Sequence, residues 1–208
     1  MASLIRAYGG GVDAGRRDTL FDVAALARFT PETGRSIEMG LARKSRAPNL
    51  YQRYPWSTQP MAALMNNFQG DGNGYIGNPD LKPELATGID IALERYLPQG
   101  GVLSANVFHR RLKDYIRNTT EAEDVSWSPV PRFVSRPKNL GRAVTQGIEL
   151  EAKFRLDQLI DGAPPVELRN NLSLFRSKVA QVPGPDNRLD EQPHATANFG
   201  ADYRFRGT

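Results

Sequence analysis

The segment "YIGNPDLKPELATGIDIALERYLPQGG", residues 75–101, decides the fold, because a loop rich in Gly, Asn, Asp and Pro passes directly into an alternation of polar and apolar residues. The large apolar residues take odd positions: Leu85, Ile89, Ile91, Leu93 and Leu97. The acidic residues take even positions: Glu84, Asp90 and Glu94. A period of two is typical of a β-strand with one apolar and one polar face. The segment predicts a strand over 84–97, preceded by a long loop.

The same alternation recurs along the chain and predicts about seven strands in total, hence an all-β fold. The other predicted strands cover about 19–29, 35–44, 102–117, 143–156, 166–179 and 194–206. In the clearest of them, 143–156, Ile148 and Leu150 alternate with Glu149 and Glu151. The range 102–117 loses its alternation after Phe108, which predicts a bulge there.

Short and long connections alternate between these strands. Short turns are predicted near 31–34, 98–101 and 157–165, and long irregular loops near 45–83, 118–141 and 180–192. An antiparallel up-and-down meander gives this order when all tight turns lie at one end and all long loops at the other. Loops longer than about 12–15 residues are uncommon in compact domains and are often functional. The long-loop end is therefore where we expect function.

Aromatic residues add a second regularity. Phe29, Tyr96 and Phe154 each precede a short turn, and Tyr203 and Phe205 hold the equivalent place on the last strand. Such a row is typical of an aromatic belt at a bilayer interface, although aromatic residues also close the core of soluble β-sandwiches. Together with the loop asymmetry, it favours part of a large transmembrane β-barrel. Apolar side chains would then face lipid, and charged ones a water-filled interior.

Composition narrows the alternatives. The chain has 208 residues, a formal net charge of +4 and no cysteine. The small positive excess gives no footprint for nucleic acid, and the missing thiols exclude disulfides and Cys nucleophiles. No apolar run reaches the ~20 residues of a transmembrane helix, and no signal peptide is visible. Seven strands cannot close a barrel with so polar an interior, so we expect a piece of a larger exported protein.

Four stretches resemble TonB-dependent outer-membrane receptors, each at a junction of strand and loop and in the family's order. They are "RKSRAPNLYQRY" (43–54), "GNPDLKPELATGIDIAL" (77–93), "PKNLGRAVTQGIELEAKF" (137–154) and "EQPHATANFGADYRF" (191–205). The resemblance implies a barrel of about 22 strands around an N-terminal plug, in the bacterial outer membrane. Residues 1–208 would be a C-terminal portion of that barrel, with the plug and the TonB box outside this sequence.

The resemblance also implies a function and partners. Receptors of this kind import scarce nutrients with energy relayed by the TonB complex, which binds the missing N-terminal region. The expected partners are that complex, the lipid bilayer and a small nutrient or metal ligand, with no nucleic acid. Segment 50–78 most resembles receptors for copper. Met61 and Met65, four positions apart, could place two thioethers on one side of a helical turn, and thioethers favour Cu(I). Alternatively, the pair packs with Leu64 and Phe68.

Other candidate residues carry weaker signals. Tyr54 and Trp56 lie in the predicted outer loop, where they could contact a ligand or cap the loop's own small core. His109 and His194 are far apart in sequence and lie on or beside strands, which favours a structural role. Asp71 and Asn73 could meet a cation such as Ca²⁺, but their setting favours a solvated turn.

Catalytic patterns are missing from the sequence. It has no G-x-S-x-G elbow, H-E-x-x-H motif or Walker loop. Glu149 and Glu151 share a strand face and could form an acid–base pair, but Lys153 and Arg155 on that face favour a balanced interior lining. We therefore expect no enzyme and no cofactor. The competing hypothesis is a soluble all-β binding or adhesion module, in which Ile148, Leu150 and Phe154 would be buried between two sheets.

Overall fold

The computed structural model describes residues 15–54, 74–124, 129–182 and 187–205. The chain forms two compact units, which are described separately. The sheet unit comprises residues 22–44, 86–111 and 143–208, and the loop unit residues 1–21, 45–85 and 112–142.

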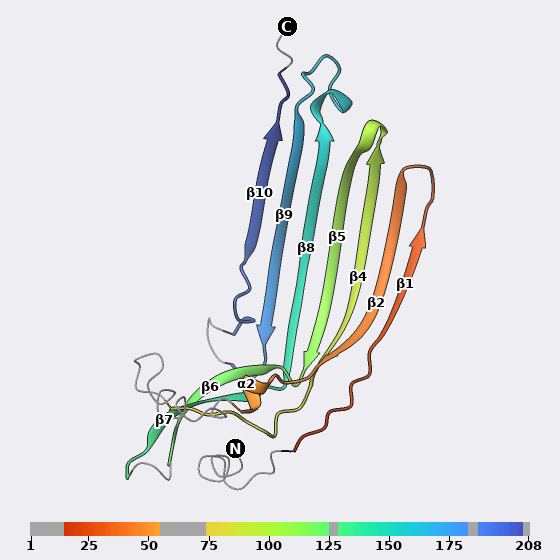
Figure 1. The fold of residues 1–208 in the computed structure, drawn as a ribbon. Helices are drawn as coiled ribbons and strands as arrows, with labels where there is room; N and C mark the ends of the chain where they lie inside the picture. The colour runs from red at the N-terminus through yellow and green to blue at the C-terminus, as the bar shows by residue number, and fades with distance from the viewer. Residues whose placement is uncertain (1–14, 55–73, 125–128, 183–186, 206–208) are drawn as a thin grey trace. The chain divides into compact units, whose positions relative to one another are not determined.

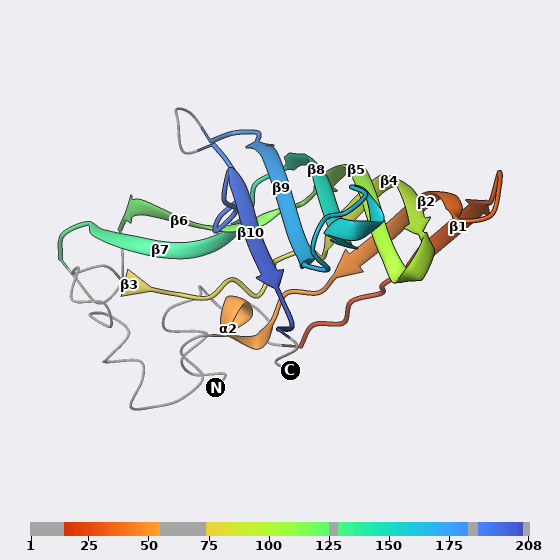
Figure 2. The same cartoon turned by 90° about the horizontal axis from the view of Figure 1, so that it is seen from above.

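One seven-stranded sheet dominates the fold (Figure 1). Its strands are β1 (Val23–Phe29), β2 (Arg35–Arg46), β4 (Glu84–Leu97), β5 (Gly101–Lys113), β8 (Arg142–Arg155), β9 (Glu167–Val179) and β10 (Ala195–Asp202). They lie side by side in this order, and successive arrows run in opposite directions (Figure 1). Seen from above, the strands form a single layer (Figure 2). The predicted all-β antiparallel meander is confirmed.

The strand boundaries follow the alternation closely. The predicted strand over 84–97 is confirmed at both ends as β4. The range 102–117 is divided: β5 ends at Lys113, and Asp114 has a positive φ of 56°. Asn106 of β5 contacts Glu149 of β8, and three residues further on His109 contacts Gln146. The register of the two strands is therefore unchanged as far as His109. The expected bulge is therefore a turn at Asp114, beyond the end of the strand.

The two faces of the sheet differ in chemistry. On the outward face, Ile148 lies opposite Leu174 and Leu150 opposite Leu172, and the row continues to Ala195 and Ala197 on β10. These large side chains are exposed: Ile148 by 44%, Leu150 by 42% and Leu172 by 37%. A soluble sandwich would bury them against a second sheet. Their exposure contradicts that alternative and agrees with an apolar face turned toward lipid.

Short turns join the strands at one end of the sheet. Gly34, with φ +81°, ends the β1–β2 turn and accepts a hydrogen bond from the Tyr96 amide at 2.7 Å. The 3-10 helices η1 (Pro98–Gly100) and η2 (Leu156–Gln158) form the next two turns, and the Gln158 side chain donates to the Pro98 carbonyl at 2.6 Å. The predicted order of short turns is confirmed. The long connections leave from the opposite end, here called the long-loop end.

The loop unit contains its own structure. Helix α2 (Leu50–Arg53) begins with a capping box between Asn49 and Gln52. A three-stranded sheet follows the order β3 (Gly74–Tyr75), β7 (Arg132–Asn139) and β6 (Ile116–Glu123). β6 and β7 form an antiparallel hairpin where an irregular loop over 118–141 was expected. That expectation was wrong because "IRNTTEAE" in β6 has no apolar alternation to reveal a strand.

Candidate functional site

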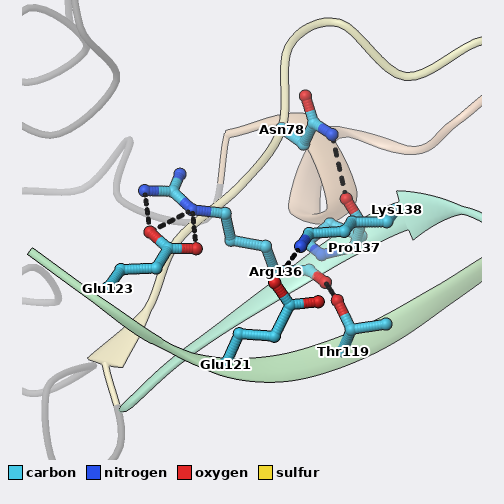
Figure 3. Close-up of polar contacts among 7 residues, drawn as sticks. All are labelled: Asn78, Thr119, Glu121, Glu123, Arg136, Pro137 and Lys138. Carbon is cyan, nitrogen blue, oxygen red and sulfur yellow. Dashed lines mark hydrogen bonds and ion pairs between the residues drawn. The ribbon is translucent and has the colours of Figure 1, made fainter. Parts of the chain in front are cut away.

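The strand-entry motif "NPDLKPE" (78–84) ties the long loops of the loop unit together, and Asn78 is its first anchor. The Asn78 amide donates to the Gln52 carbonyl at 2.9 Å, and its side chain donates to the Pro137 carbonyl at 3.0 Å (Figure 3). Its side-chain oxygen accepts from the Asp80 amide at 3.0 Å, closing an Asx turn. Asn78 therefore joins the α2 segment to strand β7.

Leu81 is the second anchor. Its side chain is buried in the core of the loop unit with Ile76, Ile116 and Val134. The Leu81 carbonyl accepts from the Arg53 guanidinium at 2.9 Å. Arg53 is only 7% exposed and pairs with Asp18 at 2.9 Å, so its buried charge is compensated.

Asn139 takes the place of a backbone partner for Lys82. Its side-chain oxygen accepts from the Lys82 backbone amide at 2.9 Å, and its side-chain nitrogen donates to the Lys82 carbonyl at 3.0 Å. The same side-chain nitrogen donates to the Asp114 carbonyl at 2.8 Å. One side chain thus joins the approach to β4, the start of the hairpin and its end.

Glu84 completes the set of anchors. It is 8% exposed, and one carboxylate oxygen accepts from the Ile116 amide at 2.7 Å. The other oxygen pairs with the Arg46 guanidinium at 2.5 Å. Both carboxylate oxygens therefore have a partner, which offsets the cost of burying this polar group. Asn78, Leu81, Asn139 and Glu84 are hereafter called the clasp.

The clasp holds the β6–β7 hairpin, one face of which is charged (Figure 3). Arg136 donates to both carboxylate oxygens of Glu123 at 3.0–3.1 Å, and Lys138 pairs with Glu121 at 2.7 Å. Thr119 donates to the Arg136 carbonyl at 3.4 Å. These cross-strand pairs stabilise a hairpin that has little apolar surface.

The polar face of the sheet unit is lined by paired charges. Asn106 donates to Glu149 at 3.0 Å, which accounts for one member of the suggested acid–base pair. Toward the short turns, Glu167 lies 2.9 Å from Arg169 and 3.8 Å from Lys153, and Arg169 reaches Asp202 at 3.6 Å. Ion pairs on neighbouring strands are what a balanced interior lining requires. Within the described residues, no three His, Asp or Glu side chains gather into a metal-binding group.

One glycine on this face is covered by aromatic rings. A Cβ at Gly147 would lie 2.8 Å from the Phe108 ring and 2.6 Å from the Leu174 carbonyl oxygen. The Phe108 ring is buried, with its centroid 6.2 Å from that of Phe175, and the Arg110 guanidinium lies 4.6 Å above it. The close packing of Phe108 explains why this strand position lacks a side chain.

Of the predicted site residues, the described part of the chain includes Tyr54 alone. Tyr54 ends α2, where its amide donates to the Leu50 carbonyl at 2.6 Å, and its side chain is half-buried. Trp56, Met61 and Met65 lie outside the described residues, so their suggested roles stay predictions. Asp71 and Asn73 also lie outside them.

The two histidines have separate partners. His109 contacts the Gln146 side chain at 3.1 Å, and His194 contacts Arg188. Sequence reasoning missed Arg53 and Asn139, which act on the motif from distant segments. The only available signal was that both fall in stretches resembling family junctions.

The prediction that Tyr96 belongs to the aromatic belt is wrong. The Tyr96 hydroxyl donates to Glu94 at 2.6 Å, so Tyr96 shares the polar face. Its even position required this, since Leu93 and Leu97 occupy the outward face. Phe29 and Phe154 do lie on the outward face, opposite Ile37 and Leu168 respectively.

Comparisons with known proteins give the family. The sequence model described as TonB dependent receptor-like, beta-barrel, matches residues 7–208. The chain therefore belongs to the TonB-dependent receptors, whose members lie in the bacterial outer membrane, and its sheet is part of their β-barrel. A search of curated protein sequences finds no match. Among the described residues, no helix is long and apolar enough to span a bilayer.

Solved structures show the same fold. The copper transporter OprC is similar with a TM-score of 0.62 at 19% identity, over 91% of this chain and 25% of that one. A ferric enterobactin receptor variant, PfeA from Pseudomonas aeruginosa in complex with enterobactin, has a TM-score of 0.59 at 20% identity, over 88% and 25%. The siderophore receptor PirA from Acinetobacter baumannii has 0.58 at 19%, over 89% and 26%. The chain spans about a quarter of the length of these receptors.

Proposed function

We propose that the intact protein containing this chain imports a scarce nutrient across the outer membrane, with energy supplied by the TonB complex. The observation that carries the proposal is the inverted exposure of the sheet. Its large apolar side chains are the exposed ones, while on the opposite face Glu149 accepts from Asn106 and Arg169 pairs with Glu167. A spanning strand needs this arrangement, because lipid covers one face and water or a plug the other.

We propose a metal as the cargo, either as copper or as a chelate. Both classes occur among the similar structures, as a copper transporter and as siderophore receptors. The copper form would use the thioethers of Met61 and Met65. The chelate form would rely on the outer loops, with Tyr54 and Trp56 as candidate contacts. The clasp supports either form, because it holds the described residues on both sides of the segment 55–73, through Gln52 and Asn78.

Uptake by the intact receptor separates the two forms. A deletion strain complemented with the wild-type gene is given radioactive copper in one arm and radioactive ferric enterobactin in the other. The double variant Met61→Leu/Met65→Leu should lose copper uptake if the thioethers bind the ion. Met39→Leu is the matched control, because Met39 is an exposed methionine on the outward face of β2. Copper uptake that is unchanged in the double variant would reject the ligand role of Met61 and Met65.

A further inference from the structure

The cations of the outward face are not spread evenly. Toward the long-loop end, β5 carries Arg111, and β9 carries Arg176 and Lys178, all exposed. Arg176 lies opposite Gln146 and Lys178 opposite Val144, so both share the face of Ile148 and Leu150. His109 of β5 contacts Gln146 of β8, and the two strands are antiparallel. Two residues further along β5, Arg111 therefore also lies opposite Val144. Strands lie about 4.8 Å apart and residues of one strand about 3.4 Å, so the Cα atoms of the three cations fall within about 12 Å of one another.

This face offers the three cations no carboxylate. Every Asp and Glu within the seven strands of the sheet unit stands at a strand position whose side chain lies on the polar face. The pairs of Asp90 with Arg110 and of Glu149 with Asn106 are examples. Within the described part of the chain, neither Arg111, Arg176 nor Lys178 forms an ion pair. Three neighbouring cations without an acidic partner need an external anion or water.

A hollow borders the cations on the side of the apolar rows. It has a volume of about 430 Å³, and its lining includes Val107, Ile148 and Leu174 together with His109, Gln146 and Arg176. The apolar members belong to the rows that face lipid, and the polar members lie next to Arg111 and Lys178. The surface thus combines a cationic end with an adjoining apolar hollow. This arrangement matches a lipid whose anionic headgroup is joined to apolar acyl chains.

We propose that Arg111, Arg176 and Lys178 bind the phosphate groups of a phosphorylated outer-leaflet lipid, one of whose acyl chains lies over Val107, Ile148 and Leu174. Arginine and lysine are the usual partners of phosphate, and long cationic side chains at a membrane interface extend toward headgroups. The proposal rests on the proposed function in one respect, the placement of the barrel in the outer membrane. It assigns the site a structural lipid and no part in cargo recognition.

The test uses the intact receptor, purified in neutral detergent, with lipid binding measured by native mass spectrometry. The probes are diphosphorylated lipid A, the same lipid without its phosphates, and inorganic phosphate. Arg176→Gln/Lys178→Gln should weaken binding of the diphosphorylated lipid about 30-fold, from about 1 kcal/mol for each cation near a charged headgroup. Arg111→Gln is a second, milder variant. Arg95→Gln is the matched control, because Arg95 is an exposed cation on the same face of β4 near the short turns.

The expected result is tight binding of the phosphorylated lipid only, weakened by both long-loop-end variants and unchanged by Arg95→Gln. Equal binding of the dephosphorylated lipid, an equal effect of Arg95→Gln, or displacement by equimolar inorganic phosphate would each overturn the proposal. Uptake distinguishes this failure from failure of the proposed function. If the receptor transports the cargo, the lipid-site variants should still take it up. If the transport proposal is wrong, the wild-type receptor itself will give no cargo uptake, although it binds the phosphorylated lipid.

Discussion

The carboxylate of Glu84 accepts a hydrogen bond from the backbone amide of Ile116 at 2.7 Å, joining two residues that lie 32 positions apart in the sequence. Glu84 begins β4 and Ile116 begins β6. The side chain thus fixes the start of the loop hairpin to the start of a spanning strand. Its second partner, Arg46, ends β2, so three chain segments meet at one carboxylate.

Replacing Glu84 should loosen the loop unit. Glu84→Ala leaves the Ile116 amide and the Arg46 guanidinium without their acceptor, at a cost of about 1–3 kcal/mol. We expect faster proteolytic cleavage of the 114–141 segment in the intact, folded receptor. Glu121→Ala is the control, because its pair with Lys138 is exposed and contributes less than about 1 kcal/mol. Equal cleavage rates in the two variants would contradict a clasp role for Glu84.

Asn139 should tolerate no isosteric change. Asn139→Asp keeps the acceptor for the Lys82 amide but removes the donor to two carbonyl oxygens, those of Lys82 and Asp114. A carboxylate facing these carbonyls is repelled by them, so the free energy of unfolding should fall by about 1–3 kcal/mol. Urea denaturation in micelles provides the measurement. Asn118→Asp, at an exposed position of β6, should leave the midpoint unchanged.

The contrast between β4 and β6 shows what the sequence could and could not predict. β4 was located to the residue because apolar and acidic residues alternate along it. β6 and β7 were missed because their stability comes from ion pairs such as Arg136 with Glu123, which leave no hydrophobic period.

The contacts of the candidate site were also beyond local patterns. Asn139 and Lys82 are 57 positions apart, and nothing in the sequence specifies that they meet. Tyr96 was assigned to the belt by its closeness to a turn, although its even position already placed it on the polar face. The odd or even position of a residue along its strand was a stronger signal for its face than its closeness to a turn.

Gly147 should resist substitution while Gly200 accepts it. A Cβ at Gly147 would lie 2.6 Å from the Leu174 carbonyl oxygen, whereas at Gly200 the nearest atom, the Arg169 carbonyl oxygen, is 3.6 Å away. Gly147→Ala should therefore lower the free energy of unfolding by about 1–3 kcal/mol through overpacking, and Gly200→Ala by much less. Equal midpoints of urea denaturation in micelles would show that the Leu174 carbonyl and the Phe108 ring both move aside without cost.

A charge on the outward face should be far more costly than one on the polar face. Leu172→Arg places a guanidinium among Leu150 and Ala197, where lipid is expected, at a cost of about 2–4 kcal/mol near the bilayer midplane. Ser173→Arg, one residue further on, faces Glu149 and should be tolerated. Folding yield of the intact receptor in lipid vesicles measures both. Similar yields would mean that Leu172 does not face lipid.

Expressed alone, residues 1–208 should not remain monomeric in water. The outward rows expose Leu93, Ile148 and Leu172 together, and β1 and β10 each have a single neighbour among the described strands. An unpaired edge beside an apolar face favours pairing with further copies. We expect large assemblies in plain buffer, and smaller, uniform particles in neutral detergent, by size-exclusion chromatography with light scattering. A uniform monomer without detergent would mean that this face is covered by protein, and would contradict its assignment to lipid.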